Sequence, residues 1–141
     1  MKRTLCCAAV LLAVAACQVS PDARPAAPLA PLPEKVQKMP YGQLLERSRA
    51  LAKAANEAFY VDNWENLEES ASGLEQVALY LVAADDVPRK HADTIKTTSA
   101  DLGKAAKELR TAAAAKDVNK TTEAMTKVQR VVREMRLGDG M

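Results

Sequence analysis

Aromatic residues are scarce in this chain of 141 residues, at 4% of the total, and glycine occurs only five times. Sheets favour aromatic and β-branched side chains, whereas abundant alanine favours closely packed helices. Lys and Arg number 20 against 18 Asp and Glu, so the chain lacks the strong positive charge of a nucleic-acid-binding protein. The composition predicts one small all-α domain that binds no nucleic acid.

Cysteine is confined to the first 17 residues, and histidine occurs once. Cys6 and Cys7 would leave with a cleaved signal segment and Cys17 would be modified, so the mature chain would hold no free thiol. This excludes disulfides, thiolate metal sites, a cysteine nucleophile and covalently bound haem. One histidine and scattered glycines supply neither a Ser-His-Asp set nor a phosphate loop, and we expect no enzymatic activity.

Residues 1–16 are predicted to be a lipoprotein signal peptide. Two basic residues precede an apolar stretch from Leu5 to Ala16, which is shorter than the about 20 residues of a membrane span and suits a secretory signal. The stretch ends in Val-Ala-Ala-Cys, which resembles a bacterial lipobox. Cys17 would then carry acyl chains such as palmitate, and several chains together anchor a protein stably. The alternative is an ordinary signal peptide with a chance cysteine.

The residue after the anchor is Gln18 rather than aspartate. By resemblance to the lipoprotein sorting rule, we expect the protein at the outer membrane, facing the periplasm. Loss of the two basic residues of the signal would leave the mature chain without net charge.

Residues 17–39 are predicted to be a linker rich in proline and alanine. Five of the seven prolines lie between positions 21 and 33. Proline fixes an extended backbone, so this segment would form a semi-rigid spacer that reaches roughly 60 Å at about 3.1 Å per residue. A motif for a proline-binding module is the alternative.

From Pro40 to Leu137 apolar residues recur every three or four positions, which predicts four helices. Asp62 with Glu65 would cap the second helix as a capping box, and the third would be the longest, at about 28 residues from Pro88 onward. The expected core rows are Leu44/Leu51/Ala58 with Leu45/Ala52/Phe59, Trp64/Ala71/Ala78 with Leu67/Leu74/Leu81, Ala92/Ser99/Ala106/Ala113 with Ile95/Leu102/Leu109, and Val118/Met125/Val132 with Thr121/Val128/Met135.

The expected connections, around 60–63, 84–88 and 115–117, are short and force neighbouring helices to run antiparallel. We therefore predict an up-down-up-down four-helix bundle over 40–137, followed by a flexible tail at 138–141. A continuous coiled-coil oligomer is the competing architecture, and the three breaks argue against it.

The region Tyr41–Arg136 resembles the cytochrome c′-type four-helix family through Trp64, Leu67, Leu74 and Ala78 and through the amphipathic last helix. The resemblance implies a bundle whose last helix would hold a Cys-x-x-Cys-His haem motif. The matching positions here are Val132, Met135 and Arg136, so the resemblance implies a haem-free relative, and we expect no cofactor.

A non-covalent b-type haem needs only two axial ligands, usually histidine and methionine. The weak candidates are His91, near the start of the third helix, and Met39. The simpler interpretation is that His91 is solvated or caps a helix. Met125 and Met135 fall on the core seam and are expected to pack there.

From Ala54 to Pro88 the chain carries eight acidic residues and no Lys or Arg. Six of these residues form the candidate partner-binding face: Glu57, Asp62, Glu65, Glu68, Glu69 and Glu75. One interpretation is that the helices complement each other in charge, with a basic last helix, and that the charge keeps the protein soluble. The sharper one is a docking face for a basic partner or for divalent cations. The glutamates lack the inward Glu-x-x-His pairs of a di-iron bundle, and we expect no metal site.

An aromatic cluster of Phe59, Tyr60 and Trp64 lies where the first two helices meet, and Trp64 is expected to pack inward. Together these features predict a lipid-anchored envelope protein that acts as a non-catalytic structural or interaction module. Its partner would be an envelope protein or a cell-wall component. A b-type haem or metal-binding, cytochrome-like electron-transfer protein is the alternative.

Overall fold

The computed structural model describes residues 29–136. The expected signal peptide, Cys17, the first part of the linker and the C-terminal tail lie outside the described residues. The described part folds into helices, which confirms the all-α prediction, and none of them is long and apolar enough to cross a membrane. The helices are α1 (Tyr41–Tyr60), α2 (Trp64–Val82), the single turn α3 (Arg89–Ala92), α4 (Ile95–Ala114) and α5 (Val118–Arg136).

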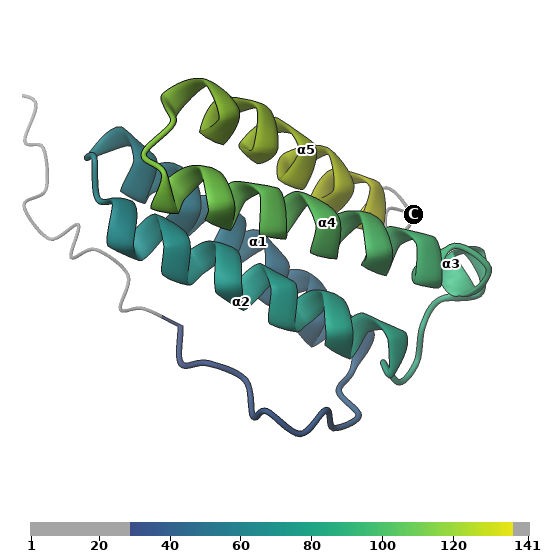
Figure 1. The fold of residues 1–141 in the computed structure, drawn as a ribbon. Coiled ribbons are helices and arrows are strands. Elements are labelled where there is room, and N and C mark those ends of the chain that lie inside the picture. The colour runs from purple at the N-terminus through teal and green to yellow at the C-terminus, as the bar shows by residue number, and fades with distance from the viewer. Residues whose placement is uncertain (1–28, 137–141) are drawn as a thin grey trace, which may run out of the picture.

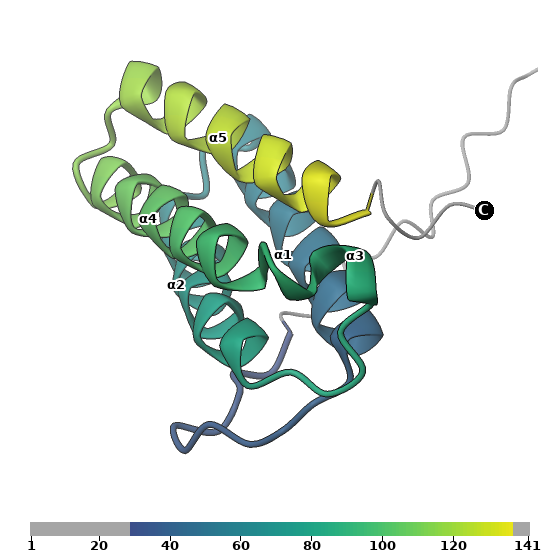
Figure 2. The same ribbon diagram turned by 90° about the vertical axis from the view of Figure 1, so that its right-hand side faces the viewer.

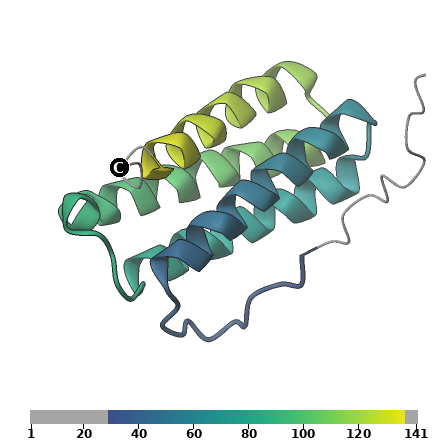
Figure 3. The same cartoon turned by 180° about the vertical axis from the view of Figure 1, so that it is seen from behind.

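Each of the four long helices packs against two others. Helices α1 and α4 both contact α2 and α5, and all four lie side by side in Figure 1. Seen from behind, α1 lies in front, with α2 and α5 on either side of it (Figure 3). The apolar rows that recur at helical spacing therefore face one common interior.

The core follows the expected rows closely. Its largest fully buried side chains are leucines, among them Leu44 on α1, Leu74 on α2 and Leu102 on α4. On α5, Met125 and Met135 are buried, as expected for core methionines. Buried alanines on α1, α2, α4 and α5 separate these larger side chains and let the helices approach closely.

The prediction of one long third helix from Pro88 is wrong. The chain forms the single turn α3, breaks at positions 93 and 94, and begins α4 at Ile95. In Figure 1 α3 is seen nearly end-on while α4 runs across the picture, so the two are steeply inclined, and Figure 2 shows the same bend. The Thr94 hydroxyl donates to the His91 carbonyl over 3.3 Å, a local bond that competes with helix continuation.

This bend explains why Ala92, which was expected on a core row, is exposed. Ala92 belongs to α3 and does not share the axis of α4, so the sevenfold spacing to Ser99 is lost. Val118 was also expected in the core and is 54% exposed, because it is the first residue of α5 and lies beside the turn.

The expected capping box of Asp62 with Glu65 does not form, and the N-cap of α2 lies one residue later. Asn63, not Asp62, caps the helix, since its side-chain oxygen accepts from the amide of Asn66 at 3.1 Å. Asp62 instead has a φ of 55° and makes no cap. Glu65 lies in the first turn of α2, where its charge favours the helix dipole without completing a box.

Residues 29–39 do not extend freely away from the helices. Leu32 is 8% exposed, and its amide donates to the Gln76 side chain on α2 at 3.1 Å. The Tyr41 amide donates to Asp85, and the Asp85 amide donates to Met39, so a short parallel bridge ties the start of α1 to the end of α2. The described part of the predicted spacer, residues 29–39, is therefore held against the helices.

Candidate functional site

The turn between α1 and α2 is closed by backbone hydrogen bonds. The Asp62 amide donates to Phe59, and the Asn63 amide donates to Ala58, which together form a Schellman motif with Asp62 in the left-handed position. The turn between α4 and α5 repeats this pattern, with Lys116 at a φ of 53°. Both turns are therefore closed by the same pair of backbone hydrogen bonds.

Two large apolar side chains project from the first of these turns. Tyr60 is 78% exposed and Val61 is 72% exposed. Beneath them, Phe59 contacts Trp64 edge to face, with ring centroids 5.9 Å apart. Trp64 is half-buried against the core, as the sequence predicted, while Tyr60 remains available to solvent.

Four carboxylates surround this turn and continue along α2. Asp62, Glu65, Glu68 and Glu69 are all exposed. Among the residues that the structure describes, no cation lies within ion-pair distance of any of the four. We call Tyr60, Val61 and these four carboxylates the acidic tip.

The other two residues of the predicted acidic face do not share this character. Glu57 forms an ion pair with Lys53 one turn earlier, at 3.5 Å. Glu75 is half-buried and pairs with Arg110 of α4 at 3.0 Å. Sequence reasoning placed all six in one face, and the structure separates the four of the tip from two that serve internal ion pairs.

The last helix does not neutralise the acidic segment. Within the described ranges, the cations of α5 pair with Asp117, Glu108 and Glu134, and none of these ion pairs reaches α2. The geometric reason is that α5 packs on α4 and α1. Where the acidic segment is paired among the described residues, its partners are Lys38, Lys53 and Arg110, so charge complementarity between helices is met by α4 and not by the last helix.

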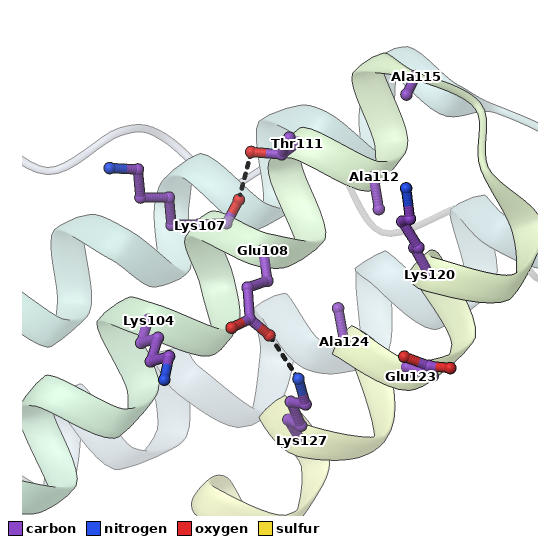
Figure 4. Close-up of a pocket in the computed structure, with 10 residues that line it drawn as sticks. All are labelled: Lys104, Lys107, Glu108, Thr111, Ala112, Ala115, Lys120, Glu123, Ala124 and Lys127. Atoms are coloured by element: carbon purple, nitrogen blue, oxygen red, sulfur yellow. Dashed lines mark hydrogen bonds and ion pairs between the residues drawn. The ribbon is translucent and has the colours of Figure 1, made fainter.

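A groove of about 500 Å³ lies between α4 and α5, and the sequence analysis did not identify it. Its floor is formed by small side chains, Ala112, Ala115 and Ala124, which leave the seam between the helices unfilled. Lysines and glutamates flank this floor in Figure 4. The flanking residues are Lys104, Lys107, Glu108, Thr111, Lys120, Glu123 and Lys127.

Internal ion pairs already hold half of the groove's lysines. The Lys127 ammonium donates to Glu108 across the groove at 2.6 Å, as the dashed line in Figure 4 marks, and Lys120 pairs with Asp117 at 3.3 Å. The hydrogen bond from Lys127 lowers the pKa of Glu108. The groove thus has an apolar floor and a volume typical of ligand-binding sites. Carboxylates largely compensate the charge of its lysines.

The weak haem candidates lie at the opposite end of α1 from the acidic tip. The His91 ring stacks on Tyr41, with centroids 5.7 Å apart, and its Nε2 atom is buried without a hydrogen-bond partner. Met39 is half-buried against the core, two residues before Tyr41. Neither residue lines the groove, and axial coordination by the buried Nε2 would require the groups around it to move.

Metal binding by the acidic face is not supported by the geometry. Across the described residues, no three His, Cys, Asp or Glu side chains come together closely enough to hold a metal ion. The described residues thus offer no preformed metal cluster, and cation binding by the acidic face stays a prediction.

Comparison with known proteins adds no relative: no family model, curated protein or solved structure matches this chain.

Proposed function

We propose that this chain is a lipid-anchored cell-envelope protein that acts as a non-catalytic interaction module. Its anchor would be Cys17, diacylated before residues 1–16 are removed and N-acylated afterwards, and it would face the periplasm from the outer membrane. The four long helices would run up, down, up and down as one bundle. The short turns at 61–63 and 115–117 and the pairwise packing of the helices support this arrangement.

The acidic tip is the surface that would contact the partner, and its composition is the observation that carries the proposal. Exposed carboxylates without internal counter-charges attract a basic partner and accelerate its association. Tyrosine is enriched among the residues that dominate binding energy, and Tyr60 lies beside these carboxylates at 78% exposure. The partner would be an envelope protein with a segment rich in lysine or arginine.

The groove between α4 and α5 is the weaker binding surface on the same criteria. Its lining combines four lysines with two glutamates, and two of the lysines are engaged in ion pairs. The acidic tip carries charge of one sign only. A charged partner would therefore be attracted more strongly to the acidic tip than to the groove.

The docking proposal is tested by neutralising charge in two matched sets. Complexes are cross-linked in the native envelope and then purified by capturing the full chain. In the tip variant of this chain, Glu65, Glu68 and Glu69 are changed to glutamine. The control set, Glu46→Gln, Asp101→Asn and Glu123→Gln, removes the same charge from exposed sites away from the tip. The tip variant should recover less than a tenth of the basic partner, and the control should recover nearly all of it. Equal recovery by both would contradict the proposal.

The anchor is tested by the mass of the protein isolated from its own membrane. The mature protein should carry the mass of several acyl chains and lack residues 1–16, and Cys17→Ser should abolish both changes. An unmodified full-length mass would contradict the lipoprotein assignment.

A further inference from the structure

A second cleft, of about 240 Å³, lies between α1 and α5, on the side of α5 that faces away from α4. Two side chains of α1 and four of α5 line it. These residues are Arg49, Ala52, Gln129, Val132, Arg133 and Arg136.

Three exposed arginines therefore border one small cleft. No carboxylate belongs to the lining, and none of the three arginines has an ion-pair partner among residues 29–136. Two other arginines of residues 29–136 do form ion pairs: Arg110 pairs with Glu75, and Arg130 lies 4.0 Å from Glu134. Like charges that converge without an internal anion repel one another, and a bound anion would relieve that repulsion.

The helix spacing explains how the cations converge. Gln129, Arg133 and Arg136 are three or four residues apart, so they lie on one face of α5, and Arg49 faces them from α1. Arg133 and Arg136 are in the last turn of α5, where the helix dipole favours cations. That effect does not account for Arg49, which lies in the interior of α1.

The floor of the cleft strengthens its attraction for an anion. Val132 is 7% exposed and Ala52 is half-buried, so the floor between the arginines is apolar. Guanidinium forms paired hydrogen bonds to phosphate and carboxylate oxygens, and these bonds strengthen as water is excluded. The Gln129 amide adds a neutral group that can also donate.

We propose that this arginine cleft binds a phosphate group, either as a free phosphate ester or as the headgroup of an anionic lipid. The space accommodates one small anion or headgroup rather than a folded partner. The inference does not rest on the acidic tip or on the lipid anchor, since it uses only Arg49, Arg133 and Arg136 and their surroundings.

The test uses the full chain carrying Cys17→Ser, so that no acyl group contributes to membrane binding. Inorganic phosphate and glycerol 3-phosphate are titrated by calorimetry against chloride at matched ionic strength. Arg49→Gln and Arg133→Gln should each weaken binding at least tenfold. Arg130→Gln, on the same helix but outside the cleft, should change it less than twofold. Equal losses in all three variants, or equal effects of phosphate and chloride, would overturn the site.

Vesicles distinguish the two sources of the phosphate group. Binding to phosphatidylglycerol vesicles but not to phosphatidylcholine vesicles, lost in Arg49→Gln and retained in Arg130→Gln, assigns a lipid headgroup. Binding of soluble phosphate with the same arginine dependence, without vesicle binding, assigns a free phosphate ester. The absence of arginine-dependent binding in both arms would contradict the proposal.

Discussion

The hydroxyl of Tyr80 on α2 donates a hydrogen bond to the carbonyl of Pro33 at 2.8 Å, and the Lys35 carbonyl lies 3.1 Å from the same oxygen. Tyr80 is only 2% exposed, so this side chain connects the core to the segment that precedes α1. The end of the proline-rich region is therefore part of the folded domain.

Tyr80→Phe should release this segment without opening the core. The variant keeps the ring and loses one hydrogen bond, and we expect the free energy of unfolding to fall by about 1 kcal/mol. Trypsin should cleave at Lys35 and Lys38 faster than in the parent chain, as followed by mass spectrometry. Tyr60→Phe, which alters an exposed hydroxyl, is the control. Unchanged cleavage in Tyr80→Phe would contradict the role assigned to the contact.

The two glycines in helix interiors should respond differently to alanine. A Cβ at Gly103 would lie 3.4 Å from that of Ala78, an ordinary contact, so Gly103→Ala should stabilise the protein by about 0.5–1 kcal/mol through helix propensity. A Cβ at Gly73 would lie 2.9 Å from a methyl carbon of Leu51, which is itself buried. Overpacking of this kind costs about 1–3 kcal/mol, so Gly73→Ala should be less stable than the parent.

Denaturant titration of both variants measures the difference. Equal stabilisation by the two substitutions would show that α1 and α2 are less closely packed around Leu51 than the structure has them.

Local sequence signals predicted the helices well, because apolar spacing and turn residues act over a few positions. The row Leu67, Leu74 and Leu81 is fully buried, and α5 begins directly after Lys116 and Asp117 as expected. Asp117 accepts from the Lys120 amide at 3.0 Å, which is the cap that a turn at this point requires.

The features that sequence reasoning missed depend on contacts between distant residues. Leu32 is buried because Gln76 and Tyr80, more than 40 positions away, form hydrogen bonds with the backbone of its segment. The bend after α3 accompanies the stacking of His91 on Tyr41, which no periodicity encodes. The groove arises from alanines of two helices, and those alanines were interpreted only as a means of close packing.

Acid should destabilise the protein in part through two carboxylates near the turn between α4 and α5. The side-chain hydrogen bond from Lys127 lowers the pKa of Glu108, and the backbone hydrogen bond from Lys120 lowers the pKa of Asp117. A carboxyl whose pKa is lower in the folded state stabilises that state above its unfolded pKa, and the contribution is lost as pH falls through the folded value.

We therefore expect the free energy of unfolding to decline as the pH falls below about 4.5, the ordinary value for glutamate. The variant Glu108→Gln/Asp117→Asn should show a shallower decline. Glu123→Gln, which removes a groove carboxylate with no ion-pair partner among the described residues, serves as the control. Parallel declines in the double variant and the parent chain would contradict the assignment.

Haemin should not bind through His91. The Nε2 atom of this residue is buried and its ring is covered by Tyr41, so axial coordination would require α3 to move. A haemin titration followed by absorbance should give the same spectrum for the parent chain and for His91→Ala. A Soret band shift that disappears in His91→Ala would support the electron-transfer alternative against the present proposal.

The central claim, that the acidic tip is the contact surface of an envelope interaction module, is tested most directly by a photo-cross-linking residue placed at position 60 in the native envelope. Position 79 is the matched control, because Leu79 on α2 is also exposed, at 65%, and lies outside the acidic tip. We predict one discrete adduct to a basic partner from position 60, reduced at high salt and absent with the triple glutamine variant, and no such adduct from position 79. Adducts of equal yield from both positions, insensitive to salt, would contradict the claim.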